Sequence, residues 1–326
     1  MPPNPSPLGA PSADDLSAWH RVWTAASSHD RPGEPLPSPA SVRRALTAAG
    51  EDSRQLLWLV RRPGGDPTAT AALRLPASDR VPTAGLDLVV HPAHRRMGTG
   101  SRLLATATEA AAAEGCAGVT AEVPAGAPGE DFLATRGFVP VQRLTWQRLA
   151  LCEVPERVVK LPDVPHPGYR LSVWEGPPPP ALAAGFAAAR GTLGGGPRGD
   201  AGRHAPHLGE HDTAEAAARR GERLLTVAAL ADPDGAVAGY TRLVLPAEAA
   251  EPARQLDTAV LPGHRGNGLG LWLKAAMLRR VRGDHPAVAE ITTGTADDNR
   301  HMHALNAALG YRPLRRTVAY RLALRR

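Results

Sequence analysis

LDLVVHPAHRRMGTG, at residues 86–100, recurs at residues 256–270 as LDTAVLPGHRGNGLG, with eight of the fifteen positions identical. In each copy an apolar run typical of a strand is followed by Pro, then by Arg-x-x-Gly-x-Gly, and then by a long helical pattern. An internal repeat of this length indicates two copies of one domain rather than one large domain. The chain of 326 residues is long enough for two domains, each with its own core.

The repeated segment predicts a phosphate site in each copy. A strand that leads through a glycine-rich turn into a helix leaves free backbone N–H groups at the positive end of the helix dipole, and this arrangement binds phosphate or pyrophosphate. The pattern lacks the third glycine of a dinucleotide-binding loop and the Gly-Lys-Ser/Thr of a P-loop. The structural alternative is an ordinary tight turn, which two copies with the same flanks disfavour. The expected loop residues are Arg95, Arg96, Met97, Gly98, Thr99, Gly100 and Ser101 in the first copy and Arg265, Gly266, Asn267, Gly268, Leu269 and Gly270 in the second.

Composition disfavours several classes of protein. The net charge is +6, but Lys160 and Lys274 are the only lysines among 38 cationic residues, and the arginines are scattered among acidic residues. We therefore expect no nucleic-acid partner. No apolar run is long enough to cross a membrane, and the first residues do not have the pattern of a secretory signal, so we expect a cytoplasmic protein without a membrane partner. The two cysteines, Cys116 and Cys152, match no disulfide framework or metal motif.

The order of expected elements predicts a mixed α/β fold in each half, with an antiparallel start and a parallel crossover. Residues 1–12 are rich in proline and are predicted to be disordered. Residues 13–150 are predicted to form the first domain, whose second helix begins after Ser38 and stops at Gly50. Residues 151–168 contain four prolines and few apolar residues, which indicates a linker. The same order of elements then restarts, so residues 169–326 are predicted to form the second domain.

A second motif lies at residues 291–311, ITTGTADDNRHMHALNAALGY, in which a strand is followed by a helix. Together with the loop before it, this segment resembles the GNAT superfamily of N-acetyltransferases over nearly the whole of residues 170–326. In that superfamily the helix carries Asn-x-x-Ala-x-x-x-Tyr, followed by Gly-Phe. Here Asn299 takes the Asn place, Met302 the Ala place and Gly310-Tyr311 the Gly-Phe place. The doubled arrangement resembles the tandem members of the superfamily.

The resemblance implies two consecutive domains of this fold and an enzyme that uses acetyl-CoA. The glycine-rich loop then holds the coenzyme pyrophosphate, and the next strand splays away so that the gap receives the pantetheine arm. The backbone around Val260 pairs with that arm and offers an N–H to the thioester oxygen, with Val90 at the corresponding place in the first half and Asn299 also assigned to the coenzyme site. The neutral primary amine of a small-molecule acceptor attacks the thioester directly, without a cysteine nucleophile.

The first half keeps the loop but not the rest of the motif, because Gly126 takes the Asn place and Leu133 the Tyr place. Catalysis is therefore assigned to the second half. The first half is expected to be degenerate at its acceptor site and to bind coenzyme A in a structural or regulatory role.

The catalytic residues are marked less clearly than the loop. Asn306 replaces the tyrosine that often protonates the departing thiolate, and a carboxamide cannot donate a proton in that role. His303 shares a helical stripe with Asn299 and Asn306, which makes it a candidate catalytic group, with an exposed or capping histidine as the alternative. Asp257 is a candidate general base, acting directly or through water. The alternative, a structural carboxylate, is favoured by the matching Asp87 in the first half.

One loop is rich in histidine, a common metal ligand. His204, His207 and His211 lie near Glu210 and Asp212 without a regular ligand spacing, so no metal is predicted, and the loop is expected to cover the acceptor. Two other functions stay open from the sequence. One is an acyl-CoA-binding or sensing protein without transferase activity, and the other is a protein N-acetyltransferase.

Overall fold

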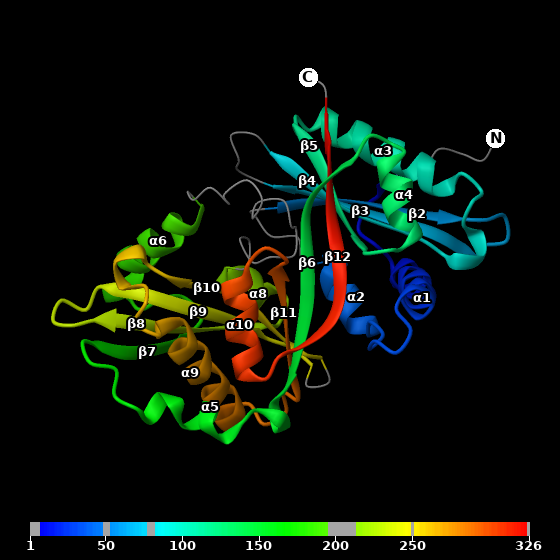
Figure 1. The fold of residues 1–326 in the computed structure, drawn as a ribbon. Helices are drawn as coiled ribbons and strands as arrows, with labels where there is room; N and C mark the ends of the chain where they lie inside the picture. Colours follow the sequence, from blue (N-terminus) through cyan, green and yellow to red (C-terminus); the bar gives the residue numbers. More distant parts are fainter. Residues whose placement is uncertain (1–6, 48–52, 77–81, 195–212, 249–250, 325–326) are drawn as a thin grey trace. The chain divides into compact units, whose positions relative to one another are not determined.

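The computed structural model describes residues 7–47, 53–76, 82–194, 213–248 and 251–324, which form two compact units (Figure 1). The first unit takes in the chain up to Gln142 together with Val318–Arg326, and the second takes in most of the chain from Arg143 to Thr317. Both units combine a mixed sheet with helices, so the predicted α/β class is confirmed.

The first unit is built on a sheet with the strand order β1-β2-β3-β4-β5-β12. The strands are β1 (Pro7–Leu8), β2 (Ser53–Arg61), β3 (Pro67–Pro76), β4 (Thr83–Val90), β5 (Gly118–Pro124) and the end of β12 (Arg312–Ala323). Neighbours from β1 to β4 are antiparallel, and β5 runs parallel to β4. The helices are α1 (Ala13–Asp30), α2 (Pro39–Thr47), η1 (Pro92–His94), α3 (Thr99–Ala113) and α4 (Pro128–Ala134).

Alternating residues of the first sheet pack against helices on opposite faces. Leu57 of β2 and Ala72 of β3 pack with Trp19 of α1 and with α2. Trp58, the residue after Leu57 on β2, packs instead in the cluster that contains Leu103 of α3. Successive side chains of a strand point to opposite faces, so a sheet with two apolar faces needs cover on both. Figure 1 shows α1 and α2 below the sheet and α3 and α4 above it.

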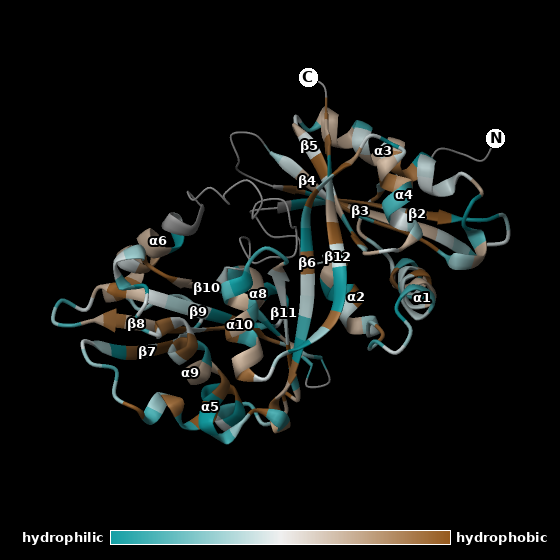
Figure 2. Ribbon diagram, in the orientation of Figure 1, coloured by the Kyte–Doolittle hydropathy of each residue, from teal (hydrophilic) through white to brown (hydrophobic). Residues whose placement is uncertain are grey.

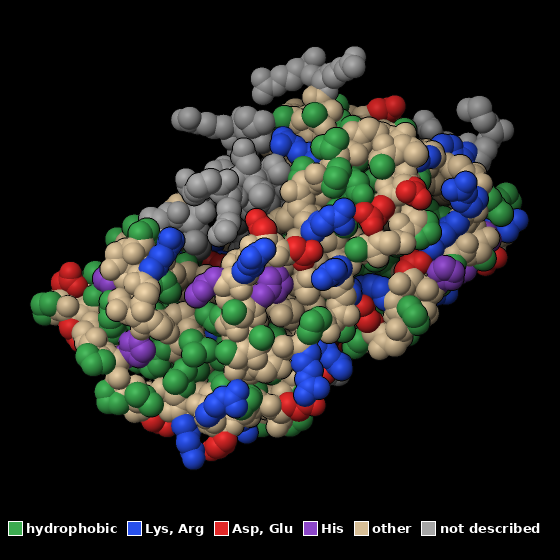
Figure 3. Space-filling view, in the orientation of Figure 1, with side chains coloured by type: hydrophobic (Ala, Val, Ile, Leu, Met, Phe, Trp, Pro, Cys, Tyr) green, Lys and Arg blue, Asp and Glu red, His purple; other side chains and the backbone are tan. Residues whose placement is uncertain are grey.

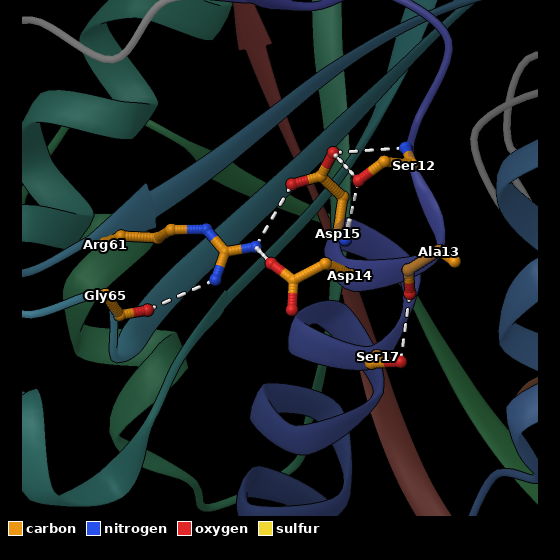
Figure 4. Close-up of polar contacts among 7 residues, drawn as sticks. All are labelled: Ser12, Ala13, Asp14, Asp15, Ser17, Arg61 and Gly65. Atoms are coloured by element: carbon orange, nitrogen blue, oxygen red, sulfur yellow. Dashed lines mark hydrogen bonds and ion pairs between the residues drawn. The ribbon is translucent and has the colours of Figure 1, made fainter.

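The start of α1 is tied to the hairpin of β2 and β3 (Figure 4). Ser12 and Asp15 form a capping box, in which the Asp15 backbone N–H donates to the Ser12 hydroxyl and the Ser12 N–H donates to the Asp15 carboxylate. Arg61 of β2 donates to Asp14 at 2.6 Å, to Asp15 at 3.1 Å and to the Gly65 carbonyl at 3.1 Å. The Ser12 hydrogen bond is the main cause that lowers the pKa of Asp15, followed on the same side by Arg61.

The second unit has the strand order β6-β11-β10-β9-β8-β7. The strands are β6 (Val139–Ala150), β7 (Tyr169–Glu175), β8 (Arg223–Ala231), β9 (Val237–Leu245), β10 (Ala253–Val260) and β11 (Glu290–Ala296). Within the described part of this unit, β10 and β11 are parallel, whereas the pairs β6–β11, β9–β10, β8–β9 and β7–β8 are antiparallel. The helical segments are η2 (Leu151–Glu153), α5 (Glu156–Lys160), η3 (Leu161–Asp163), α6 (Pro180–Gly194), α8 (Ala214–Arg219), η4 (Pro262–His264), α9 (Leu269–Asp284) and α10 (Arg300–Leu309).

The second sheet is also covered on both faces. Every residue of β9 is buried, and Figure 2 shows hydrophobic residues along β8. On one face Leu243 packs in a cluster with Trp272 of α9 and Leu309 of α10. On the other face Tyr240 packs with Phe186 of α6, their ring centroids 5.0 Å apart. The repeated strand of this half, β10, therefore lies between β9 and β11 inside a sheet that is covered on both faces.

Each unit takes its last strand from the other half of the sequence. The end of β12 belongs to the first unit, where Val318 and Tyr320 are buried in the core and the Leu324 N–H donates to the Ala117 carbonyl at 3.0 Å. Residues 144–150 of β6 belong to the second unit and pair antiparallel with β11. The compact units therefore do not coincide with the expected ranges 13–150 and 169–326.

The segment expected to be a linker, 151–168, folds onto the second unit. It forms η2, α5 and η3, and Leu151, Val154 and Val158 are buried in the core beneath α9. The reason is visible in the spacing of these residues, which repeats every three to four positions and suits one face of a helix. Pro155 is the N-cap of α5, and Pro162 lies in the first turn of η3, where a proline is tolerated. Pro165 and Pro167 follow η3.

Other expectations are partly outside the described residues. Outside the described residues lie residues 1–6, Gly50 and the loop with His204, His207 and His211. Pro7 and Leu8 were also expected to be disordered, but they pair with β2. Among the described residues no helix is long and apolar enough to cross a membrane. On the face shown in Figure 3, Lys and Arg side chains lie beside Asp and Glu.

Candidate functional site

In both units two parallel strands separate shortly before the glycine-rich loop. β10 and β11 pair at only two positions, the last being Arg254 with Thr292, although both strands continue beyond it. β4 and β5 pair at three positions, the last being Gly85 with Thr120, and they also continue. Each unit therefore has the splayed pair that the resemblance implies.

The strand that leads into the second loop has a β-bulge. The pairing of β10 with β9 shifts by one residue between Gln255 and Thr258, whereas β4 stays in one register with β3 from Gly85 to Val90. A bulge bends a strand and changes the direction of its side chains, and bulges are frequent beside active sites. Asp257 lies within this bulge.

The second loop ends in an open helix N-terminus. Gly268 is the N-cap of α9 with φ of 72°, and no side chain caps the helix. The first helical hydrogen bonds run from the N–H groups of Leu271 and Trp272 to the Gly268 carbonyl, both at 3.2 Å. The preceding N–H groups therefore have no partner within the helix, which is the arrangement that binds an anion. Arg265 Nε donates to the Val260 carbonyl at 3.2 Å and fixes the loop to β10.

The first loop repeats this geometry with two differences. Arg95 Nε donates to the Val90 carbonyl at 3.2 Å, but its two terminal nitrogens also hold both oxygens of Asp30, each at 2.7 Å. Over the described residues Arg265 has no corresponding carboxylate within 4.0 Å. Arg96 has φ of 65°, where the second loop has Gly266 at 85°. A side chain at positive φ is strained, so the first loop is less relaxed than the second.

The second glycine of each loop has little room for a side chain. A Cβ at Gly270 would lie 3.1 Å from the Leu305 side chain of α10, and one at Gly100 would lie 3.3 Å from the Val90 side chain of β4. The other predicted loop residues lie at the helix starts. Thr99 and Leu269 are the first residues of α3 and α9. In the first loop Met97 is 66% exposed, and the Ser101 hydroxyl accepts from Arg136 at 2.6 Å.

Asp257 is held on both oxygens. Arg242 Nε donates to one oxygen at 2.5 Å, and the Tyr240 hydroxyl donates to the other at 2.8 Å. Burial, and then the nearby Asp257 charge, raise the pKa of Tyr240, so this phenol keeps its proton. Asp87 of the first unit similarly accepts from Arg74 at 2.6 Å. An Asp–Arg pair in both units supports the structural interpretation of Asp257, although only Asp257 lies in a bulge.

Asn299 and His303 both serve the start of α10. Asn299 is the N-cap, and its side-chain oxygen accepts from the Met302 N–H at 3.1 Å. His303 Nε2 lies 3.1 Å from the Ala296 carbonyl, which can only accept, so that nitrogen carries the hydrogen. His303 therefore links α10 to the last residue of β11, and its Nδ1 is the nitrogen left for any other partner.

Asn306 is fully buried in a network that sequence reasoning did not identify. Its oxygen accepts from Lys274 Nζ at 2.5 Å, and its nitrogen donates to Gln147 at 2.8 Å and to Thr295 at 3.2 Å. Lys274 is also buried, which lowers its pKa to about 7, and its Nζ lies 5.0 Å from the centre of the Tyr311 ring. The sequence feature that could have indicated this network is Lys274, the single lysine within the apolar pattern of α9.

The two cysteines and the metal-binding residue types form no further site among the described residues. Cys116 is buried and Cys152 is exposed. Across the part of the chain that the structure describes, no group of three or more His, Cys, Asp or Glu side chains is placed to hold a metal ion.

Comparison with known proteins identifies what these two units resemble. Residues 18–138 and 199–311 each match the model of the acetyltransferase (GNAT) family. Among solved structures, a tandem GNAT protein from the clavulanic acid biosynthesis pathway is 29% identical, with 97% of each chain covered and a TM-score of 0.77. A GCN5-related N-acetyltransferase from Sphaerobacter thermophilus is 18% identical, with 100% of this chain and 98% of that chain covered and a TM-score of 0.69, and shows the fold alone. Curated protein sequences gave no match.

Proposed function

The chain belongs to the GNAT family of acetyltransferases, and from this premise we propose an acetyl-CoA-dependent N-acetyltransferase that acts in its second unit. The acceptor is the primary amine of a small molecule. The observation that carries the proposal is the combination, in one unit, of splayed strands, a bulge and an open loop at the start of α9. The first unit has the splay and the loop without the bulge, so we assign coenzyme binding to it and not catalysis.

The proposed reaction uses the backbone more than ionisable side chains. The N–H groups from Gly266 to Gly270 bind the pyrophosphate, and the backbone near Val260 aligns the pantetheine arm and stabilises charge on the thioester oxygen. The amine nitrogen forms the amide bond as the carbon–sulfur bond breaks and the thiolate leaves. Asp257 is the candidate base, acting through water, and His303 is the candidate proton donor to the thiolate. Because its Nε2–H is held by the Ala296 carbonyl, His303 donates from Nδ1, which requires the doubly protonated ring. His303→Ala should then lower turnover more than coenzyme affinity.

A specific observation keeps a second function in view. Asn306 occupies the place of the family tyrosine and is enclosed by Lys274, Gln147 and Thr295, so no acid stands at that place. An acyl-CoA-binding or sensing protein has no need of such an acid. A protein N-acetyltransferase is distinguished from both by its acceptor.

One experiment separates these functions. The purified full chain is mixed with acetyl-CoA and a panel of small amines or amine-bearing peptides, and free thiol is measured over time. Thiol release that depends on a small amine supports the proposal, and release only with peptides supports a protein substrate. Coenzyme that copurifies, seen by native mass spectrometry, without any thiol release supports a binding protein.

A further inference from the structure

A histidine from the segment before β7 contacts the loop at the start of α9. His166 Nε2 lies 2.6 Å from the backbone oxygen of Asn267, and its ring is stacked on Trp272 with centroids 4.5 Å apart and planes inclined by 17°. A backbone carbonyl only accepts hydrogen bonds, so Nε2 carries the hydrogen and His166 donates. The ring is thus fixed by a flat neighbour, and one hydrogen bond links it to the loop.

This hydrogen bond sets the direction of one backbone N–H. A trans peptide is planar, so the carbonyl of Asn267 and the N–H of Gly268 point in opposite directions. With the carbonyl held toward His166, the Gly268 N–H is held pointing away from the imidazole. Gly268 is the N-cap of α9, so this N–H is among the donors that the helix leaves free.

The rest of Asn267 is fixed as well. Its side-chain nitrogen donates to the Tyr169 hydroxyl and to the His264 carbonyl, both at 3.2 Å. The Tyr169 hydroxyl is also 3.1 Å from His264 Nδ1. His166, from the segment before β7, therefore holds the Asn267 carbonyl, and Tyr169, the first residue of β7, accepts from its side-chain nitrogen. The peptide that follows Asn267 cannot rotate without breaking the His166 contact.

The first loop has no such support among the described residues. Met97 stands at the place of Asn267, is 66% exposed, and has no hydrogen bond to its carbonyl from a described residue. The two loops share the Arg-x-x-Gly-x-Gly pattern, so the difference lies in the residues outside the pattern. Among the described residues, a donor that fixes the peptide before the N-cap is found only in the second unit.

We propose that His166 is a positioning residue of the second coenzyme site, which holds the Gly268 N–H in the direction that binds the pyrophosphate. This inference rests on the proposed function, because it takes the loop at α9 to be a coenzyme site. A donor held before the ligand arrives strengthens binding, since the loop need not be ordered at that moment. The role requires a hydrogen-bond donor at residue 166, and a flat ring alone does not fulfil it.

The test measures binding of coenzyme A to the full chain by isothermal titration calorimetry, in a Gly98→Asp background that disables the first loop. His166→Phe keeps a ring against Trp272 and removes the donor, whereas His166→Gln keeps an N–H donor. We expect His166→Phe to weaken binding about tenfold and His166→Gln to stay within about threefold of the parent. His94→Phe, a matched change beside the first loop, should leave this affinity unaltered.

Pantetheine, which lacks the phosphates, supplies a second readout. Its affinity, measured by competition, should be the same for His166→Phe and the parent if His166 acts on the pyrophosphate donors. Unchanged coenzyme A binding by a folded His166→Phe protein would overturn the inference, and so would equal losses in the Phe and Gln variants. If the parent binds no coenzyme A, the proposed function fails, and this inference fails with it.

Discussion

The loops of the two units share one sequence pattern and differ in how their surroundings hold them. In the second loop Gly266 has a positive φ, the Asn267 carbonyl is hydrogen-bonded, and Arg265 has no carboxylate partner among the described residues. In the first loop the residue at the place of Gly266 is Arg96, which is strained, and the residue at the place of Asn267 is Met97, which is exposed. The first arginine of that loop, Arg95, is paired with Asp30. A shared loop motif therefore does not make two sites equivalent, because the elements packed against the loop decide its charge and rigidity.

The largest expected contrast concerns the two Asp–Arg pairs. The two carboxylates are similarly exposed, 25% for Asp257 and 22% for Asp87, but the Arg242 side chain is only 2% exposed against 29% for Arg74. Arg242→Met should lower the free energy of unfolding by about 3 kcal/mol, because it leaves a carboxylate without its charged partner. Arg74→Met should cost about 1 kcal/mol or less. Denaturant unfolding of both variants checks this, and equal costs would remove the distinction between the pairs.

Lys274 gives a contrast that depends on pH. Leu104 stands at the matching place in the first unit, whereas burial of Lys274 lowers its pKa to about 7. Between pH 7 and the ordinary lysine pKa near 10.4, the unfolded chain binds a proton that the folded chain does not, so wild-type stability rises with pH.

Relative to Lys274→Met, the wild-type free energy of unfolding should therefore rise with pH, by up to about 1.4 kcal/mol per pH unit. Below pH 7 the difference in unfolding free energy should be constant, and the Met variant should be most stable relative to the wild type in that range. Unfolding curves measured at several pH values from 6 to 10 test this. A difference that does not vary with pH contradicts the lowered pKa.

Asn306→Tyr restores the family residue but has no free space to enter. Asn306 is fully buried and bonded to Lys274, Gln147 and Thr295. We expect a loss of about 1–3 kcal/mol in unfolding free energy and no gain in turnover. Leu133→Tyr, at the matching buried place of the first unit, is the control, with a similar loss of stability. A several-fold faster Asn306→Tyr enzyme of unchanged stability would show that the network can open.

Asp30→Asn should have the smallest effect. Burial opposes ionisation of Asp30, but hydrogen bonds from Arg95 and His29 outweigh it and lower the pKa of this carboxyl. Removing its charge leaves Arg95 free to attract phosphate, so coenzyme affinity of the first unit should rise about two- to fivefold at low salt. Titration in a Gly268→Asp background isolates that unit. Unchanged affinity would show that the Asp30 pair does not limit binding.

Much of the fold was predictable because the signals are local. The repeated strand and helix, the hairpins and the α2 N-cap at Ser38, which accepts from the Ser41 N–H at 3.0 Å, all follow from patterns within a few residues. The exchange of the last strands was not, since Phe138-x-Pro-x-x-Arg143 and Tyr311-x-Pro-x-x-Arg316 are nearly the same pattern. Either segment suits either splayed pair, and pairing partners are decided by long-range packing.

The loops were predictable for the same reason, and their surroundings were not. Arg-x-x-Gly-x-Gly specifies the turn from strand to helix, and in both turns a left-handed glycine is the N-cap of the helix. Lys274 and Asn306 meet only after the chain folds, 32 residues apart, and Asn306 bonds Gln147 at a separation of 159. His166 was assigned to a linker and is 101 residues from Asn267. No local pattern connects such residues.

The central claim is that the second unit transfers the acyl group while the first only binds coenzyme, and Gly98→Asp and Gly268→Asp test it most directly. Both glycines are N-caps in the left-handed region, which Asp tolerates better than most residues, and both changes place a carboxylate beside the pyrophosphate donors. Thiol release from acetyl-CoA with an accepted amine should fall about a hundredfold or more in Gly268→Asp and stay within about threefold in Gly98→Asp. A folded Gly98→Asp protein that loses turnover, beside a Gly268→Asp protein that keeps it, would contradict the account.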